Sequence, residues 1–207
     1  MDGEAYARYR RKGEFPAHLP DFVAHSVLDI DFDFLHSLGV EHVMMDLDQT
    51  LRRRHAKELE VEVVGHFHAL ELYIGFKSLN LVTNNRGNLE PFSEPLGANV
   101  FQPYKENGKW IQKPQGKFYQ HVLDTLGTTG PKAVMIGDKI TPDIKGANEA
   151  GIWTVLVKPR GKGYWSDRFR LVRLREWLLL KRSHRKMKLI ERMNAQRNMP
   201  NEDTDHD

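Results

Sequence analysis

The chain has 207 residues, of which 40% are hydrophobic and 29% are charged, and its formal net charge is +3. This length and composition are typical of one globular domain of about 150 residues with appended segments. No run approaches the roughly 18 apolar residues that span a bilayer, and the first residues lack the apolar core of a secretory signal. The absence of cysteine excludes disulfides and thiolate metal sites, and it fits a cytoplasmic protein.

Charge is unevenly distributed along the chain. Residues 158–197 contain 14 Lys and Arg against three acidic residues, whereas residues 198–207 contain four acidic residues and no Lys or Arg. We therefore predict four segments: a flexible basic arm over 1–18, a folded body over 19–160, a basic amphipathic helical extension over 161–196 and a disordered acidic tail over 197–207.

The first half of the body alternates between helix and strand patterns. We expect a helix over 31–38, a strand over 40–46, a helix over 60–74 and a strand over 79–83, with Gly39 and Gly75 ending the two helices. Asp29, Asp31 and Asp33 lack a preceding apolar strand, so we interpret them as the cap and first turn of the first helix. The apolar face predicted for the second helix consists of Val61, Val64, Phe67, Leu70 and Ile74.

The second half continues this alternation. After a short helical segment we expect strands over 98–102, 133–136 and 153–157, and helices over 115–126 and 142–150. Residues 103–112 interrupt the pattern, and Asn107-Gly108 within them is a strong hairpin signal. Strands that alternate with helices imply right-handed crossovers, so we predict an α/β fold with a parallel sheet covered on both faces.

Two aspartates, Asp46 and Asp48, stand where the apolar strand over 40–46 leaves the sheet. Ligand sites of parallel sheets lie at the carboxyl ends of strands, so both should face a cleft. Asp46 can attack an electrophile and Asp48 can transfer a proton. Two carboxylates this close repel each other unless a cation separates them, which implies Mg²⁺. The alternative is an acidic turn after a strand, without chemistry.

Similar positions recur downstream. Thr83 and Asn84 follow a strand, where a hydroxyl and backbone amides can bind phosphate oxygens. Asp138 and Asp143 flank the exit of the strand over 133–136 and can complete an oxygen-rich shell for Mg²⁺. Lys113 precedes a helix and can place a positive charge in the cleft, although each of these residues, taken alone, is also consistent with an ordinary surface or turn.

Taken together, the residues resemble the motifs of the haloacid dehalogenase (HAD) superfamily of phosphotransferases. Residues 46–50 resemble its first motif, Thr83 its second, Lys113 its third, and Gly137-Asp138 with Asp143 its fourth. The resemblance covers residues 19–160 and extends to the YqeG-like branch of subfamily III, which includes phosphatidylglycerophosphate phosphatases. It implies a Rossmann-like three-layer HAD fold with a parallel sheet and no large cap domain.

The resemblance also implies roles for the candidate residues. Asp46 would attack phosphorus and Asp48 would serve as the acid and base, while Thr83, Asn84 and Lys113 would bind the phosphoryl group. The resemblance implies that Mg²⁺ is bound by the side chains of Asp46 and Asp138 and the backbone carbonyl of Asp48, with Asp143 close by.

Two positions depart from the pattern of this branch, and a third is ambiguous. Gln49 stands where the branch commonly has asparagine or glycine, and Lys139 adds a charge beside the metal. The segment over 103–112 makes the third-motif lysine ambiguous: Lys113 is preferred because Pro114 and a helix follow it, and Lys105 remains the alternative.

The function that we expect is therefore a Mg²⁺-dependent phosphomonoester hydrolase that converts phosphatidylglycerophosphate to phosphatidylglycerol. Its basic helical extension would contact an anionic phospholipid membrane, placing a cytoplasmic protein on the inner face of that membrane. Arg52, Arg53 and Arg54 would either contact an anionic headgroup or form a solvated basic loop. Two alternatives stay open: a phosphatase for soluble sugar phosphates or nucleic-acid phosphate ends, and a less favoured nucleic-acid- or ribosome-binding protein on a HAD scaffold.

Overall fold

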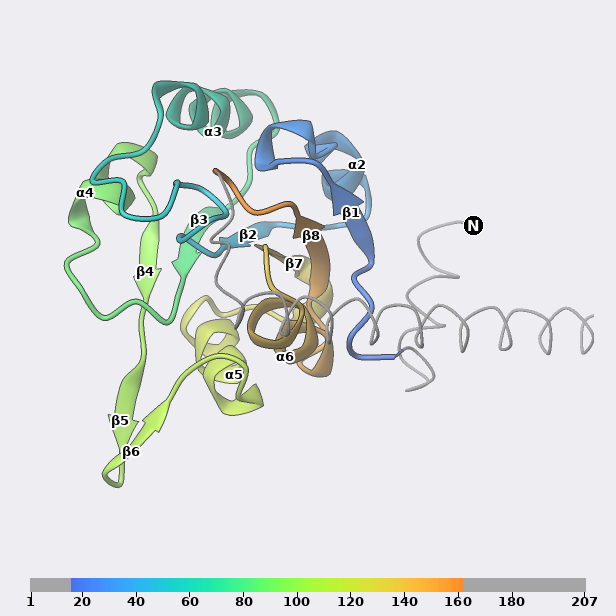
Figure 1. Cartoon of the computed structure of the whole chain (residues 1–207). Helices are drawn as coiled ribbons and strands as arrows, with labels where there is room; N and C mark the ends of the chain where they lie inside the picture. The colour runs from blue at the N-terminus through green and yellow to red at the C-terminus, as the bar shows by residue number, and fades with distance from the viewer. Residues whose placement is uncertain (1–15, 162–207) are drawn as a thin grey trace, which may run out of the picture.

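A computed structural model describes residues 16–161 (Figure 1). Six strands form one parallel sheet: β1 (Phe22–Ala24), β2 (His42–Met45), β3 (Ser78–Val82), β4 (Asn99–Phe101), β7 (Ala133–Gly137) and β8 (Trp153–Val157). The helices are α2 (Phe32–Ser37), α3 (Val61–Tyr73), α4 (Glu90–Ser93), α5 (Gly116–Thr125) and α6 (Gly146–Glu149). The predicted α/β class with a parallel sheet is thus confirmed, and no inserted domain large enough to cap the sheet occurs between residues 16 and 161.

The strand order is β1-β8-β7-β2-β3-β4, and it changes direction at β2. From β2 the chain moves outward through β3 to β4, and it then returns to the other side of β2 through β7 and β8. Met45 at the end of β2 is in register with Leu81 of β3 and Ile136 of β7. The residues that follow these three strands therefore meet at the kind of switch point where α/β sheets bind ligands.

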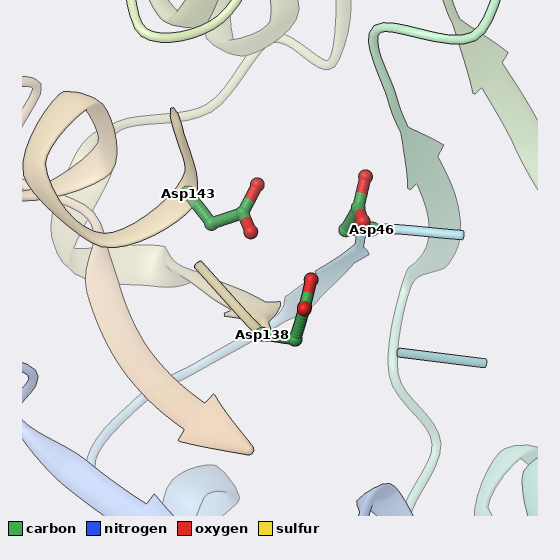
Figure 2. Close-up of side chains that lie close together, drawn as sticks. All are labelled: Asp46, Asp138 and Asp143. Carbon is green, nitrogen blue, oxygen red and sulfur yellow. The ribbon is translucent and has the colours of Figure 1, made fainter. Parts of the chain in front are cut away.

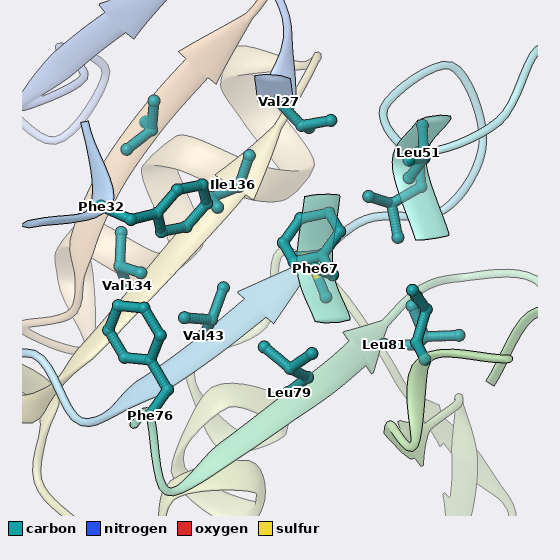
Figure 3. Packing of buried hydrophobic residues seen from close by; sticks show 14 of the residues in the cluster. Val27, Phe32, Val43, Leu51, Phe67, Phe76, Leu79, Leu81, Val134 and Ile136 are labelled. Carbon is teal, nitrogen blue, oxygen red and sulfur yellow. The ribbon is translucent and has the colours of Figure 1, made fainter. Parts of the chain in front are cut away.

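Alternate residues along the strands fill two separate cores. Val43 and Met45 pack with α2, α3 and α4 in one core, part of which Figure 3 shows, whereas Met44 packs against α5 and α6 in the other. Successive side chains of a strand point to opposite faces of a sheet, so a central strand covered by helices on both sides is buried on both faces and is mostly apolar. All four residues of β2 are accordingly buried.

The predicted elements agree with those of the structure, with local differences. The 31–38 helix is α2, whose cap Asp31 accepts a hydrogen bond from the Phe34 amide, and Gly39 follows it with a φ of +86°. The predicted apolar face of α3 is wrong at one position: Val61 is 88% exposed because it occupies the first turn, and Val63 is buried instead. The 142–150 helix is a π-helical turn (Ile140–Lys145) followed by α6.

A separate two-stranded sheet and one edge strand complete the fold. The 103–112 segment forms the predicted hairpin, with strands β5 (Tyr104–Glu106) and β6 (Lys109–Ile111), and Asn107 and Gly108 at its tip both have positive φ values. It extends away from the body at the carboxyl end of β4 (Figure 1). Strand β1, which pairs with β8, was not predicted, because three residues are too few to show a period.

The predictions for the chain ends fall largely outside the described part. Residues 1–15 of the predicted basic arm, the helical extension beyond Gly161 and the acidic tail are not described. Pro16, Ala17 and His18 belong to the body, because Asn148 Nδ2 donates a hydrogen bond to the Ala17 carbonyl at 2.8 Å. Within residues 16–161, no helix has the length and apolar character needed to cross a membrane.

Candidate active site

Three of the candidate residues directly follow neighbouring strands. Asp46 follows β2, Thr83 follows β3 and Asp138 follows β7, and all three are buried. Their positions follow from the parallel pairing of β2 with both β3 and β7, which brings the carboxyl ends of the three strands to one edge. The predicted convergence of these residues is what the topology produces.

Lys113 lies at the centre of this group. Its Nζ atom donates hydrogen bonds to Asp46 Oδ1 at 2.8 Å and to Asp143 Oδ1 at 2.7 Å, and the residue is 2% exposed. Burial by itself lowers the pKa of a lysine, but the Asp143 and Asp46 carboxylates outweigh it and raise the pKa of Lys113 to about 12. The side chain is therefore a positive charge held in a buried position between two carboxylates.

The backbone of Lys113 is fixed by the loop that follows β3. Asn84 Oδ1 accepts a hydrogen bond from the Lys113 amide, and Asn84 Nδ2 donates to the Lys113 carbonyl, both at 3.0 Å. The Asn84 side chain thus orients Lys113, and a phosphate contact from this residue would have to come from its backbone. Lys105, the alternative lysine, lies on β5 with its Nζ atom 5.0 Å from the centre of the Trp110 ring.

Asp143 enters the site from the π-helical turn. Its Oδ2 atom accepts a hydrogen bond from the Lys139 amide at 3.1 Å, and Tyr119 donates its hydroxyl to the Asp143 carbonyl at 3.1 Å. A Cβ atom at Gly137 would lie 2.4 Å from the Asp143 carboxylate, so the close approach of strand and turn requires glycine there. Burial raises the pKa of Asp143 to about 6; the Lys113 charge opposes this rise, and the Asp46 and Asp138 charges add to it.

Asp46, Asp138 and Asp143 form a buried cluster of carboxylates. One oxygen from each of them lies within 4.8 Å of the others, and Figure 2 shows the three side chains around a common space. Carboxylate oxygens are hard ligands of the kind that Mg²⁺ prefers. Two lysines, Lys113 and Lys139, lie near these three negative charges, and Lys139 Nζ is 3.1 Å from Asp138 Oδ1. The net charge of the cluster therefore still favours a further cation. The donor set therefore fits Mg²⁺.

Asp48 differs from these residues, because its carboxylate lies outside the buried cluster. Arg52 donates to Asp48 Oδ1 from Nε at 2.9 Å and from Nη2 at 2.7 Å, and Asn85 Nδ2 donates to Asp48 Oδ2 at 3.3 Å. The side chain of Asp48 is 34% exposed, which leaves it accessible at the rim of the site.

The contacts that Arg52 and Asn85 make with Asp48 were not predicted from the sequence. Neither interpretation of the arginine loop holds for Arg52: its side chain is only 12% exposed and is ion-paired with Asp48 rather than solvated or turned toward a headgroup. The four-residue spacing between Asp48 and Arg52 was a usable signal, although such pairs are expected only where the chain turns helically. Asn85 gave no separate signal beside Asn84.

Comparison with known proteins supports the same class of site. Residues 110–163 match the family described as HAD-hydrolase-like. The chain is 28% identical over 141 residues to the probable phosphatase YqeG of Bacillus subtilis, which covers 68% of this chain and 77% of that protein. It is also 40% identical to the glyceraldehyde 3-phosphate phosphatase of Methanopyrus kandleri, over 52 residues that make up 25% of this chain and 22% of that protein.

Among solved structures, the fold is similar to an uncharacterised protein from Listeria monocytogenes serotype 4b. That similarity has a TM-score of 0.47 with 19% identity and covers 62% of this chain and 87% of that one. The partial family match and the phosphatase relatives, together with the site described above, support a phosphatase of the HAD type.

Proposed function

We propose that this protein is a Mg²⁺-dependent phosphomonoester hydrolase that acts through a phospho-aspartate on Asp46. The observation that carries the proposal is the buried Lys113 ammonium, which bridges Asp46 and Asp143 beside Asp138. A fixed cation among converging carboxylates is suited to a phosphoryl group, whose transfer depends on positioning and on charge stabilisation.

In the proposed reaction, an Asp46 carboxylate oxygen attacks phosphorus and the bond from phosphorus to the leaving oxygen breaks. Asp48 gives its proton to the leaving alkoxide. Asp48 then takes a proton from a water molecule that attacks the phospho-aspartate, and phosphate and free Asp46 are released. Lys113 offsets negative charge on Asp46 and the phosphoryl group, while the Thr83 hydroxyl contacts a phosphoryl oxygen.

The metal would be held by the carboxylates of Asp46 and Asp138, with Asp143 beside them. When bound, Mg²⁺ supplies positive charge that polarises the phosphoryl group. The chain's own contribution is to hold these carboxylates close together, with the Lys113 ammonium beside them.

We further propose that the substrate is phosphatidylglycerophosphate, which would yield phosphatidylglycerol at the inner face of the cytoplasmic membrane. The resemblance of the motifs to the YqeG-like branch supports this substrate. So does the absence, within residues 16–161, of an inserted domain that would exclude a bulky lipid. The basic extension predicted for 161–196 would supply further attraction to an anionic surface.

A cationic and aromatic surface beside the site also supports a lipid substrate. The Arg86 guanidinium stacks over the Trp110 ring at 3.7 Å, and Lys105 lies on the same ring. Trp110 is 39% exposed, and its hairpin leaves the sheet at the same edge as the site. Tryptophan beside basic residues suits the boundary between an anionic headgroup layer and water.

The test is phosphate release from phosphatidylglycerophosphate in mixed micelles, beside a panel of water-soluble phosphomonoesters. Asp46→Asn, which removes the nucleophile and nearly conserves shape, is the control and should release no phosphate from any ester. Co-sedimentation with anionic vesicles should occur and should be lost when residues 162–207 are deleted. Release from the water-soluble panel alone would reject the lipid substrate but keep the phosphatase.

A phosphatase of small sugar phosphates is the second candidate. The 52-residue similarity to a glyceraldehyde 3-phosphate phosphatase favours it. In that case, hydrolysis of small phosphate esters should proceed at the same rate with and without residues 162–207, and vesicle binding should be absent.

A further inference from the structure

The carboxylate of Asp48 is held on both of its oxygens by residues from different loops. Arg52 contacts Oδ1 through two nitrogens, at 2.9 and 2.7 Å, and Asn85 contacts Oδ2 through Nδ2 at 3.3 Å. The side chain is thereby restricted to one orientation, although 34% of its surface is exposed. An exposed aspartate without such partners would sample several rotamers.

Arg52 is itself fixed by the protein and is not a mobile surface cation. Its Nη1 atom donates to the Ala56 carbonyl at 2.6 Å, and its guanidinium lies over the Phe92 ring at 4.2 Å. Its backbone carbonyl accepts a hydrogen bond from the Gln49 amide at 2.9 Å, which closes the turn that carries Asp48. Each part of the guanidinium thus has a separate contact, in the planar geometry that arginine provides and lysine does not.

Asn85 is also fixed in place, by hydrogen bonds at the loop that follows β3. Its backbone amide donates a hydrogen bond to Thr83 Oγ1 at 3.1 Å, and its side-chain Oδ1 atom accepts one from the Gly87 backbone amide at 2.8 Å. Gln102 Nε2 donates to the Asn85 carbonyl at 3.0 Å. The position of Asp48 is therefore linked to the loop that contains Thr83, the proposed phosphate contact.

We infer that Arg52 and Asn85 are positioning residues that orient Asp48 for proton transfer, an inference that rests on the proposed function. The ion pair anchors Oδ1, so Oδ2, which has only the longer amide contact, is the oxygen that exchanges a proton with the leaving group. In the transfer step the bond from phosphorus to the leaving oxygen breaks, and the Oδ2 proton moves to that oxygen. Arg52 keeps its proton throughout and touches no reacting atom.

The choice of leaving group separates this role from a general effect on folding. A phosphate ester of an alkyl alcohol has a poor leaving group and needs a proton from Asp48, whereas p-nitrophenyl phosphate has a good leaving group and needs little protonation. The value of kcat/KM reports only the steps up to formation of the phospho-aspartate, so later hydrolysis does not mask the difference.

The experiment measures kcat/KM of the full chain for glycerol phosphate and for p-nitrophenyl phosphate with Mg²⁺ present. Arg52→Met, which keeps an apolar stem against Phe92, should lose about 10²-fold on the alkyl ester and only a few-fold on the nitrophenyl ester. Arg52→Lys should recover part of the alkyl activity, because it keeps the charge. Asn85→Ala should show the same selectivity with a smaller loss.

Lys57→Met is the matched control, since this lysine is exposed in the same loop, and it should leave both rates unchanged. Equal losses of Arg52→Met on both esters, or no loss on either, would overturn the positioning role while leaving the phosphatase intact. Wild-type protein that releases phosphate neither from these two esters nor from phosphatidylglycerophosphate would overturn the proposed function and this inference with it.

Discussion

Lys113 Nζ lies 2.8 Å from Asp46 Oδ1, although 67 positions separate the two residues in the chain. The contact forms because β2 carries Asp46 to the carboxyl edge of the sheet, while β6 and the side chain of Asn84 bring Lys113 to the same edge. A buried ammonium is costly unless opposite charges surround it, so Lys113 depends on the Asp143 and Asp46 carboxylates for its charged state.

Replacement of Lys113 by methionine should lower kcat/KM for p-nitrophenyl phosphate by at least about 10²-fold, because the fixed positive charge beside the phosphoryl group is lost. Lys105→Met is the matched control and should keep nearly wild-type activity on this ester, because Lys105 contacts only the exposed hairpin face. Steady-state kinetics of the two variants decide between the two lysines. A larger loss from Lys105→Met would assign the third motif to the hairpin.

Addition of Mg²⁺ should raise the melting temperature of the protein. A ligand at 100 times its dissociation constant stabilises the folded state by about 2.7 kcal/mol, and the three carboxylates offer the site. Asp138→Asn should abolish the shift, since it removes one negative charge from the cluster. Glu149→Gln, on the exposed end of α6, should retain it. An equal Mg²⁺ response in both variants would place the ion elsewhere.

Gly137→Ala should damage the site more than a usual glycine substitution. The added methyl would lie 2.4 Å from the Asp143 carboxylate, so Asp143 has to move. A displacement of about 1 Å in a catalytic group can cost about 10²-fold in rate. Gly116→Ala, at the start of α5 with nothing within 4 Å, is the control and should have little effect. Phosphatase rates and the Mg²⁺-induced melting shift measure both variants.

Gln49→Asn should stabilise the protein by about 0.5–1 kcal/mol, because Gln49 has a φ of +69° that asparagine tolerates better than glutamine. This backbone conformation also gives a physical reason for the asparagine or glycine that the resembling branch commonly has there. Urea unfolding at constant pH measures the change. A loss of stability would mean that contacts of the Gln49 side chain stabilise the protein by more than its backbone strain costs.

The stability of the fold should decrease as the pH falls below about 6.5, partly through His42. Burial lowers the pKa of His42 from its ordinary value of 6.5, with Glu41 opposing this effect. Between the lowered pKa and 6.5 the unfolded chain binds the proton and the folded chain does not, so acid favours unfolding. The melting temperature of His42→Gln should therefore fall less between pH 8 and pH 5 than that of the wild type. An identical loss would contradict this contribution.

Much of the fold could be predicted because its signals are local. The apolar runs of β2, β3, β7 and β8, the helix-ending glycines at 39 and 75, and the Asn107-Gly108 turn each specify their own element. Thr83, Asp138 and Asp143 could be placed near Asp46 because parallel strands put their carboxyl ends on one edge. The sheet topology thus brings residues that follow different strands to one place in the structure.

The remaining features depend on contacts between distant segments. Strand β1 exists because its backbone pairs with β8, and its three residues carry no period of their own. Arg52 pairs with Asp48 across a turn in which Gln49 has a left-handed backbone, and the four-residue spacing alone does not show that the chain turns there. The π-helical turn likewise follows from the close approach of Asp143 to Gly137.

The hairpin over residues 104–111 combines a fixed base with an outward tip. Arg86 binds Gln112 at its base, whereas Asn107 and Gly108 form the tip. The tip is therefore a suitable point for chain insertion, because an element grafted there would leave the spacing between Lys113 and the sheet unchanged. Engineered versions can carry an added segment at this point without altering the residues around Lys113.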